Sequence, residues 1–257
     1  MPGAGDHADE VKLTEAGVAL ITGGGSGIGA ACARRLAADG YTVLVADIDG
    51  ARADAVAAAC GPAAAAAAWA DVSDEGSVDA LLATAARLGP LRVAVNCAAV
   101  PDNGGAIADC SFADWRRVLG VNLDGVFLCL RAEIRAMLEG GAGGSITSIG
   151  SVLGLRGHPG VPTYSTAKHA LVGLTRSAAR AYAANGIRVN LICPGYIRTP
   201  LLESRLDDDR LAALTAQHPI GRLGTAEEVA GLASWLASQD AGFVAGAVYT
   251  VDGGFTA

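Results

Sequence analysis

The chain has 257 residues, of which 51% are hydrophobic and 18% charged, and it carries a formal net charge of −7. This size and composition fit one large α/β domain, because no break in composition marks a linker. The acidic balance argues against a nucleic-acid partner, and the lack of an apolar run of about 18 residues argues against a membrane-spanning segment. Six cysteines without a CxxC pair or a histidine partner at metal spacing predict a reduced, cytoplasmic protein with no metal site.

The first predicted strand leads into a glycine-rich turn. Residues 1–12 are rich in Gly and Asp, so we expect a disordered tail ahead of a single domain at 13–257. The apolar run Val18–Thr22 is typical of a buried strand, a glycine cluster at 23–29 follows it, and a helix is predicted over Ala30–Asp39. In this context the glycines let the backbone approach a pyrophosphate, and the helix N-terminus supplies N–H donors. The segment therefore predicts dinucleotide binding, with a merely tight turn as the alternative.

An acidic residue follows the second predicted strand, Tyr41–Ala46. Asp47 lies 18 residues after Gly29, close to the spacing of about 20 residues at which an acid bonds the adenosine ribose hydroxyls. Asp49 adds a second negative charge, and the glycine turn holds no Lys or Arg, so a 2′-phosphate would be repelled. NAD is therefore favoured over NADP. The alternative is that Asp47 caps a helix over Gly50–Ala59, and the two roles are compatible.

The rest of the chain alternates between strand and helix patterns. Six alanines at 63–68 favour helix by propensity, but the alternation around them leads us to predict a strand over 65–70. An irregular, acidic segment at about 200–220 is expected to close over a substrate as a lid. Further helices are predicted over 74–88, 112–139, 163–184 and 226–237, and further strands over 91–95, 145–149, 187–192 and 247–251. The pattern predicts an α/β, doubly wound Rossmann fold with a seven-stranded parallel sheet, helices on both faces, and ligands at the carboxyl ends of the strands.

Tyr164 and Lys168 have a spacing that suits chemistry on one helix face. Residues four apart lie about one turn from each other, and with five tyrosines and two lysines in the chain the pairing is seldom expected by chance. Pro162 and Thr163 favour a helix start just ahead, which would add the positive end of the helix to the charge of Lys168. Both effects favour the phenolate, so we predict that the pKa of Tyr164 is lowered. A surface pair without a chemical role is the alternative.

Together these motifs resemble the short-chain dehydrogenase/reductase family of NAD(P)-dependent oxidoreductases, over essentially the whole chain after the tail. The resemblance rests on Thr22, Gly23, Gly27 and Gly29 in the cofactor loop, on Asp71-Val72, Asn96 and Pro194-Gly195 with Thr199, and on the set Asn122, Ser151, Tyr164 and Lys168. Ser151 stands 13 residues before Tyr164, as the family spaces them. The resemblance implies that the cofactor is bound by Gly23, Ser26, Gly27, Ile28, Gly29, Asp47, Asp71, Val72, Asn96, Ala98, Tyr164, Lys168, Pro194, Gly195, Ile197 and Thr199.

The resemblance also implies roles for the catalytic set. Tyr164 would exchange a proton with the substrate oxygen while hydride passes to or from the nicotinamide, and Lys168 would lower its pKa and bond the nicotinamide ribose. Ser151 would hold the substrate oxygen, and Asn122 would anchor a water that links Lys168 to solvent. Simpler roles are a helix kink for Asn122, a turn for Ser151 and a helix cap for Thr199. Substrate contacts are expected from Ser151, Leu153, His158, Tyr196, Leu201 and Leu202.

One departure from the family concerns the end of the fourth strand. The family usually reads Asn-Asn-Ala-Gly where this chain has Asn96-Cys97-Ala98-Ala99. A methyl group on Ala99 stands where glycine normally lets the backbone approach the cofactor ribose, so we expect a small local shift of the backbone there.

The leading hypothesis is an NAD-dependent oxidoreductase that interconverts a small secondary alcohol and a ketone. One alternative is an NADPH-type 3-oxoacyl-carrier-protein reductase, against which Asp47 and the charge of −7 argue. Another is a catalytically silent NAD-binding regulatory protein, against which the intact catalytic set argues. The expected partners are a small-molecule substrate and, by resemblance, other copies of the chain in a tetramer, with no nucleic acid and no membrane.

Overall fold

The fold is known from a computed structural model that describes residues 17–61, 65–199, 202 and 207–257. The expected N-terminal tail at 1–12 and part of the expected lid lie outside the described residues. None of the helices in the described ranges combines the length and the apolar character needed to cross a membrane.

A seven-stranded sheet in which every neighbouring pair is parallel forms the centre of the domain. The strand order is β3-β2-β1-β4-β5-β6-β9, so the order reverses between β1 and β4. A reversal of this kind opens a crevice at the carboxyl ends of the strands. The strands are β1 (Val18–Thr22), β2 (Thr42–Asp47), β3 (Ala65–Trp69), β4 (Leu91–Asn96), β5 (Gly144–Ile149), β6 (Ile187–Pro194) and β9 (Val248–Val251).

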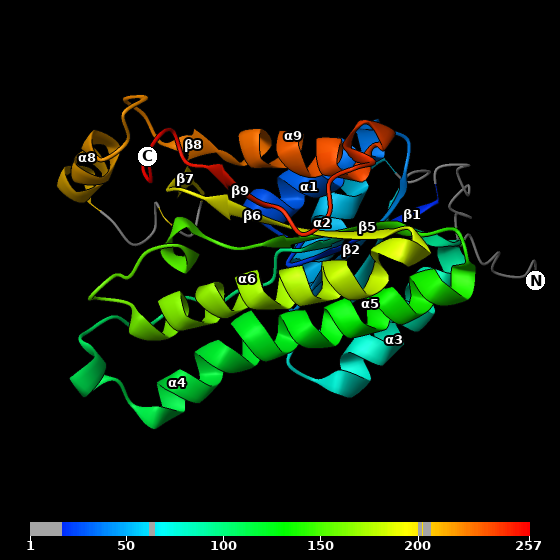
Figure 1. Cartoon of the computed structure of the whole chain (residues 1–257), viewed down its shortest axis with the longest axis horizontal. Coiled ribbons are helices and arrows are strands. Elements are labelled where there is room, and N and C mark those ends of the chain that lie inside the picture. The colour runs from blue at the N-terminus through cyan, green and yellow to red at the C-terminus, as the bar shows by residue number, and fades with distance from the viewer. Residues whose placement is uncertain (1–16, 62–64, 200–201, 203–206) are drawn as a thin grey trace, which may run out of the picture.

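Helices cover both faces of the sheet, as Figure 1 shows. One face carries α1 (Gly27–Ala38), α2 (Gly50–Cys60) and α9 (Ala226–Ala237). The other carries α3 (Glu75–Leu88), α5 (Val126–Gly140) and α6 (Pro162–Tyr182). The doubly wound Rossmann fold predicted from the alternation of strands and helices is confirmed.

Alternating side chains of the central strands build two separate cores. In β1, Ala19 and Ile21 pack with α1, α2 and α9, whereas Val18 and Leu20 pack with α3, α5 and α6. All four side chains are fully buried. A parallel strand covered on both faces needs apolar residues at every position, which is why β1 reads as an unbroken apolar run.

The alanine-rich segment forms a strand, as predicted. β3 pairs in parallel register with β2, from Val43 opposite Ala65 to Asp47 opposite Trp69. β3 stands at the edge of the sheet, and its Trp69 is exposed. Ladder hydrogen bonds and packing against the two cores outweigh the helix propensity of alanine here.

The structure corrects two element predictions. The helix expected over 112–139 is divided into α4 (Phe112–Leu119), a π-helical segment Gly120–Gly125, and α5. The segment expected to be irregular contains α8 (Asp208–Ala216), where the side chain of Asp207 accepts the backbone N–H of Arg210. An Asp at the N-cap with acidic residues after it favours a helix start, and this local signal was missed.

The carboxyl ends of the strands lie at one end of the molecule. In Figure 1 this is the end toward which β6 points, and α8 and the C-terminus lie there. Two short strands that were not predicted, β7 (Ile197–Arg198) and β8 (Gly224–Thr225), also lie there and pair in parallel. They join the chain after β6 to the start of α9, so both flanks of the expected lid are held together at this end.

Candidate active site

Ser151, Tyr164 and Lys168 meet at the carboxyl edge of the sheet. Ser151 follows β5, Tyr164 lies in the first turn of α6, and Lys168 lies one turn further along. The hydroxyl of Ser151 lies close enough to the side chain of Tyr164 to act on its pKa, and Nζ of Lys168 lies 5.5 Å from the centre of the tyrosine ring. The residues that the sequence spacing singled out, Ser151, Tyr164 and Lys168, therefore lie together in the folded chain.

The acidity of Tyr164 differs from the expectation. Burial raises the pKa of Tyr164 to about 12, and the hydrogen bond from Ser151 opposes this rise without overcoming it. The predicted net lowering of the pKa by Lys168 is therefore wrong for this structure. The reason is that the phenolate is destabilised by the loss of its hydration on burial more than it is stabilised by the neighbouring Ser151 hydroxyl.

Lys168 is a buried cation with a backbone partner. Its side chain is 2% exposed, and Nζ donates a hydrogen bond of 2.8 Å to the carbonyl oxygen of Ile149. Burial lowers the pKa of Lys168 to about 8, which leaves most of the amine protonated at neutral pH. The carbonyl that ends β5 thus holds the ammonium group within the site.

Asn122 lies in the π-helical segment between α4 and α5 and is fully buried. Its Oδ1 accepts the N–H of Val100, and its Nδ2 donates to the C=O of the same residue, both at 2.8 Å. The π-helical break agrees with the alternative role of Asn122 at a helix irregularity. The side chain fastens the loop that follows β4, and the expected water link to Lys168 stays a prediction.

The glycine turn after β1 has the shape of a phosphate cradle. Gly23 and Gly27 have φ values of 62° and 50°, which L side chains seldom adopt. A Cβ on Gly29 would lie 2.2 Å from the carbonyl oxygen of Gly23, so no side chain fits there. Among the described residues, the side chain of Ser26 makes no capping bond to α1, and the first amides of that helix, Ile28 included, have no intrahelical acceptor. These features fit a pyrophosphate group.

Asp47 is tied to the glycine turn. Its Oδ2 accepts the N–H of Gly25 at 2.9 Å, and its Oδ1 accepts the N–H of Asp49 at 3.0 Å. The residue that caps α2 is Asp49, whose side chain accepts the N–H of Arg52, so the alternative role of Asp47 as the cap is wrong. Sequence analysis missed Arg52, which also lies against the glycine turn. A Cβ added to Gly25 would come within 2.8 Å of the Cβ of Arg52, and the guanidinium of Arg52 pairs with Asp49.

Two further predicted cofactor residues lie against this cradle. A Cβ on Gly27 would meet the methyl group of Thr199 at 3.3 Å, and a Cβ on Gly23 would lie 2.6 Å from the backbone nitrogen of Ala98. The hydroxyl of Thr199 also accepts the N–H of Leu202 at 3.4 Å, so the alternative role as a cap is present as well. The turn after β1 and the segments after β4 and β6 are thus brought together.

The other predicted cofactor residues follow the ends of strands. Val72 is buried, and Ala98 packs against the small apolar cluster that contains it. The carboxylate of Asp71 accepts bonds from Ser73 of its own turn. Pro194 ends β6, Gly195 donates its N–H to the C=O of Val251, and Ile197 is buried in β7.

Ala99 causes no backbone strain. In the described ranges no residue other than glycine has a positive φ, and Ala99 is exposed. The backbone at this position therefore does not need a glycine, and the expected local shift is not required by the conformation of Ala99 itself.

Behind the site, Asn96 at the end of β4 binds a buried acid. Its Nδ2 donates to Oε2 of Glu133 at 3.0 Å, and its Oδ1 accepts from the hydroxyl of Thr22 at 3.4 Å. Glu133 on α5 is fully buried, and its Oε1 has no partner among the described residues. Burial raises the pKa of Glu133 to about 7, while the bond from Asn96 opposes the rise. Sequence analysis missed this acid, which binds the predicted cofactor residue Asn96.

We expect Glu133→Gln to flatten the pH dependence of stability. The folded protein keeps the proton on Glu133 up to about pH 7, whereas the unfolded chain loses it near the ordinary pKa of 4.5, so stability falls as pH rises through this window. The fall is about 3 kcal/mol, and Gln cannot ionise but still offers Asn96 an acceptor. Urea unfolding at pH 5 and pH 8 measures the difference, with exposed Glu139→Gln on the same helix as control. An unchanged difference in Glu133→Gln would contradict the assignment.

The predicted substrate side is only partly assembled. Leu153 is buried beside Ser151, and Tyr196 lies close enough to Tyr164 to contribute to the rise of its pKa. His158 is exposed, and its Nδ1 accepts the N–H of Gly160, so its side chain stabilises the turn of the loop in which it lies. Leu202 is partly buried, and Leu201 lies outside the described residues. Contact of these residues with a substrate stays a prediction.

His218 and Phe255 pack against Tyr196 in an aromatic group that the sequence did not predict. His218 is buried, its Nδ1 bonds the C=O of Leu214 at 2.8 Å, and its Nε2 accepts the N–H of Tyr196 at 3.3 Å. The rings of Tyr196, His218 and Phe255 lie 5.2–5.8 Å apart. A cavity of about 380 Å³ beside Phe255 is lined by Leu155, Arg156, Phe255, Thr256 and Ala257. The C-terminus therefore borders the loop that follows Ser151.

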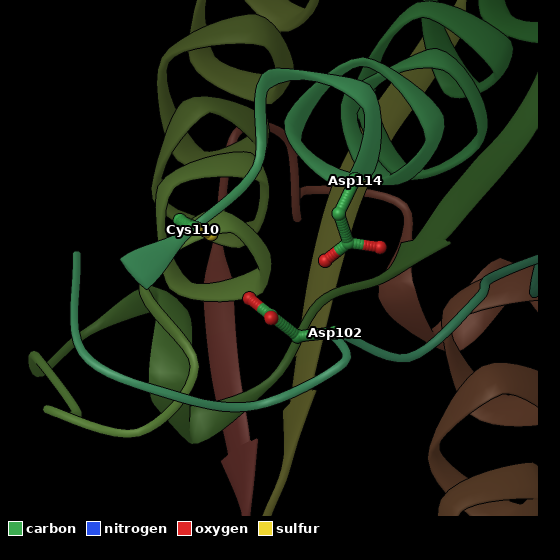
Figure 2. Close-up of side chains that lie close together, drawn as sticks. All are labelled: Asp102, Cys110 and Asp114. Atoms are coloured by element: carbon green, nitrogen blue, oxygen red, sulfur yellow. The ribbon is translucent and has the colours of Figure 1, made fainter. Parts of the chain in front are cut away.

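Asp102, Cys110 and Asp114 form a compact cluster near the start of α6, shown in Figure 2. Their potential ligand atoms lie within 4.8 Å of one another. The oxygens of Asp102 accept backbone amides, those of Asp114 accept bonds from Asn103 and Arg117, and Sγ of Cys110 lies 3.2 Å from Oγ1 of Thr163. The bond from Arg117 lowers the pKa of Asp114. We therefore assign the cluster to the support of the loop and of α6.

The parallel sheet with a glycine turn after its first strand is that of a Rossmann-type protein, and Ser151, Tyr164 and Lys168 stand together at the carboxyl edge of the sheet. The chain belongs to the short-chain dehydrogenase/reductase family. Residues 23–256 match the family described as enoyl-(acyl carrier protein) reductase. Members of the wider family use NAD or NADP, and the glycine turn of this chain fits such a cofactor.

Curated relatives match nearly the full length of the chain. A 2,5-dichloro-2,5-cyclohexadiene-1,4-diol dehydrogenase from Sphingobium indicum is 45% identical over 93% of this chain and 96% of its own length. A cis-4-hydroxycyclohexanecarboxylate dehydrogenase from Sinomonas cyclohexanicum is 46% identical, with the same shares covered. A cyclohexanol dehydrogenase from Acinetobacter sp. is 41% identical over 93% of this chain and 94% of its own length.

Proposed function

We propose that the protein is an NAD-dependent dehydrogenase that interconverts a secondary alcohol and a ketone, with Tyr164 as the general acid and base. The observation that carries the proposal is the grouping of Ser151 and Tyr164, close enough for the serine hydroxyl to act on the pKa of the phenol, with Lys168 one turn further along α6. The pair lies at the same edge of the sheet as the glycine turn. A proton-transfer group beside a dinucleotide cradle is what alcohol oxidation requires.

Each side chain has a defined task in the proposed reaction. The nicotinamide, when bound, accepts the hydride in alcohol oxidation and donates it in ketone reduction. Oη of Tyr164 takes the hydroxyl proton during oxidation and returns it to the carbonyl oxygen during reduction. The Ser151 hydroxyl holds the substrate oxygen, where negative charge develops. The ammonium group of Lys168 stabilises the phenolate while Tyr164 lacks its proton.

The preference for NAD rests on Asp47. Its carboxylate lies at the end of β2 and bonds the glycine turn, where a ribose would be held. A 2′-phosphate there would meet the charge of Asp47 and of Asp49, and the nearby Arg52 is already paired with Asp49. Both features favour the unphosphorylated ribose.

The proposed substrate carries its hydroxyl group on a six-membered carbon ring. The three relatives named above act, by their names, on cyclohexane or cyclohexadiene alcohols. The expected substrate contacts in this chain include the apolar side chains of Leu153 and Leu202, which suit a hydrocarbon ring. Assembly as a tetramer and a cytoplasmic location remain predictions.

A panel of alcohols with both cofactors tests the proposal. We expect cyclohexanol and cis-4-hydroxycyclohexanecarboxylate to be oxidised with NAD, followed by the absorbance of the reduced nicotinamide. A 3-oxoacyl thioester with NADPH serves as the matched test of the reductase alternative. Turnover of the thioester alone would favour the reductase. Tight NAD binding without turnover of any substrate would favour the silent regulatory protein.

A further inference from the structure

We propose that Asp102 is a positioning residue that fixes Tyr164 by capping α6 from a distant loop. The inference rests on the proposed role of Tyr164 and extends it to the group that sets its place. Asp102 lies in the segment after β4, 62 residues before Tyr164 in the sequence. The family motifs in this chain do not include it.

The helix that carries Tyr164 has no cap of its own. Its N-cap residue is Val161, whose side chain has no acceptor, and the helix then begins with Pro162. The first amides of a helix lack intrahelical acceptors, and leaving them buried without a partner costs free energy. Thr163 is fully buried, so water is not available as an acceptor for its backbone N–H.

Asp102 supplies the missing acceptor. Its Oδ2 accepts the N–H of Thr163 at 3.0 Å and the N–H of Tyr164 at 3.1 Å. Its Oδ1 accepts the N–H of Gly104 at 3.1 Å, and the side chain is 6% exposed. The carboxylate of Asp102 therefore binds the backbone of Tyr164 and, through Gly104, also stabilises the loop that contains Asp102. Figure 2 shows Asp102 with Asp114 turned toward it.

The loop around Asp102 is fastened on its other side. Asn122 binds both the N–H and the C=O of Val100, and Arg117 donates to the C=O of Pro101 at 2.9 Å. Asn122 thus holds Val100, two residues along the chain from Asp102, and Asp102 in turn binds the backbone of Tyr164.

The test separates position from fold. We expect Asp102→Ala to lower kcat by about 100-fold, because a shift of about 1 Å in a catalytic group costs that much, while the Kd for NAD changes less than about twofold. Asp102→Asn keeps an oxygen for the two amides, and Asn is as good a cap as Asp, so we expect its kcat to return to within about threefold of the wild type. Exposed Asp109→Ala from the same loop is the matched control and should not change kcat.

Two readouts decide the outcome. Hydrogen exchange of the peptide covering residues 161–168 should quicken in Asp102→Ala and stay slow in Asp102→Asn, and it requires no enzyme activity. A wild type that turns over no alcohol would refute the proposed function, and the exchange result would still test the cap. Unchanged exchange, an unchanged kcat per folded molecule, or an Asn variant as impaired as the Ala variant would each overturn the positioning role.

Discussion

Tyr164→Phe is expected to lower kcat/KM for alcohol oxidation by about 1,000-fold, because general acid–base catalysis contributes on this order. The change removes only the hydroxyl near Ser151 and leaves the ring beside Lys168. The glycine turn and Asp47 lie on other elements, so the Kd for NAD should stay within about twofold. Steady-state kinetics and a fluorescence titration with the reduced cofactor measure the two effects.

A matched variant and a pH profile sharpen this test. Tyr182→Phe makes the same chemical change in the last turn of α6 and should leave the rate intact. Burial raises the pKa of Tyr164 to about 12, so the phenol holds its proton at neutral pH. Oxidation needs the ionised form as a base, and its rate should therefore rise with pH above neutrality. A Phe variant with more than about a tenth of the wild-type rate would remove Tyr164 from the mechanism.

Asp47→Asn is expected to raise the ratio of kcat/KM for NADP over NAD by about 100-fold. A carboxylate and a 2′-phosphate about 4 Å apart repel by about 4 kcal/mol at a protein surface, so removal of the Asp47 charge is large enough to account for such a change in the ratio. Asn still offers an oxygen to the amides of Gly25 or Asp49, which keeps the turn in place. Initial rates with both cofactors at equal substrate concentration give the ratio.

A double variant tests the neighbouring cation. Asp49→Asn added to Asp47→Asn releases Arg52 from its ion pair, so we expect a further gain for NADP. Asp54→Asn, an exposed acid on the same helix, is the control. An unchanged ratio in both variants would show that the discrimination of the ribose lies elsewhere.

Much of the fold follows from local sequence patterns. Strands that are covered on both faces must be apolar throughout, so Val18–Thr22 and its counterparts are visible as short apolar runs. The alanine tract needed the neighbouring elements as context, because its propensity alone favours helix. The π-helical break at Gly120–Gly125 and the pairing of β7 with β8 depend on contacts between distant segments. No local pattern predicts them.

The sequence by itself determined the fold class, the glycine turn after the first strand and the Tyr164–Lys168 pair, because each shows in patterns of residues close together in the chain. Only the tertiary structure decided the cap of Asp102 on α6, the contact of Glu133 with Asn96, and the direction of the Tyr164 pKa shift. The first two join residues 62 and 37 positions apart. The third depends on how much water several elements together exclude from one hydroxyl group, and desolvation of that kind arises only when the whole chain has packed.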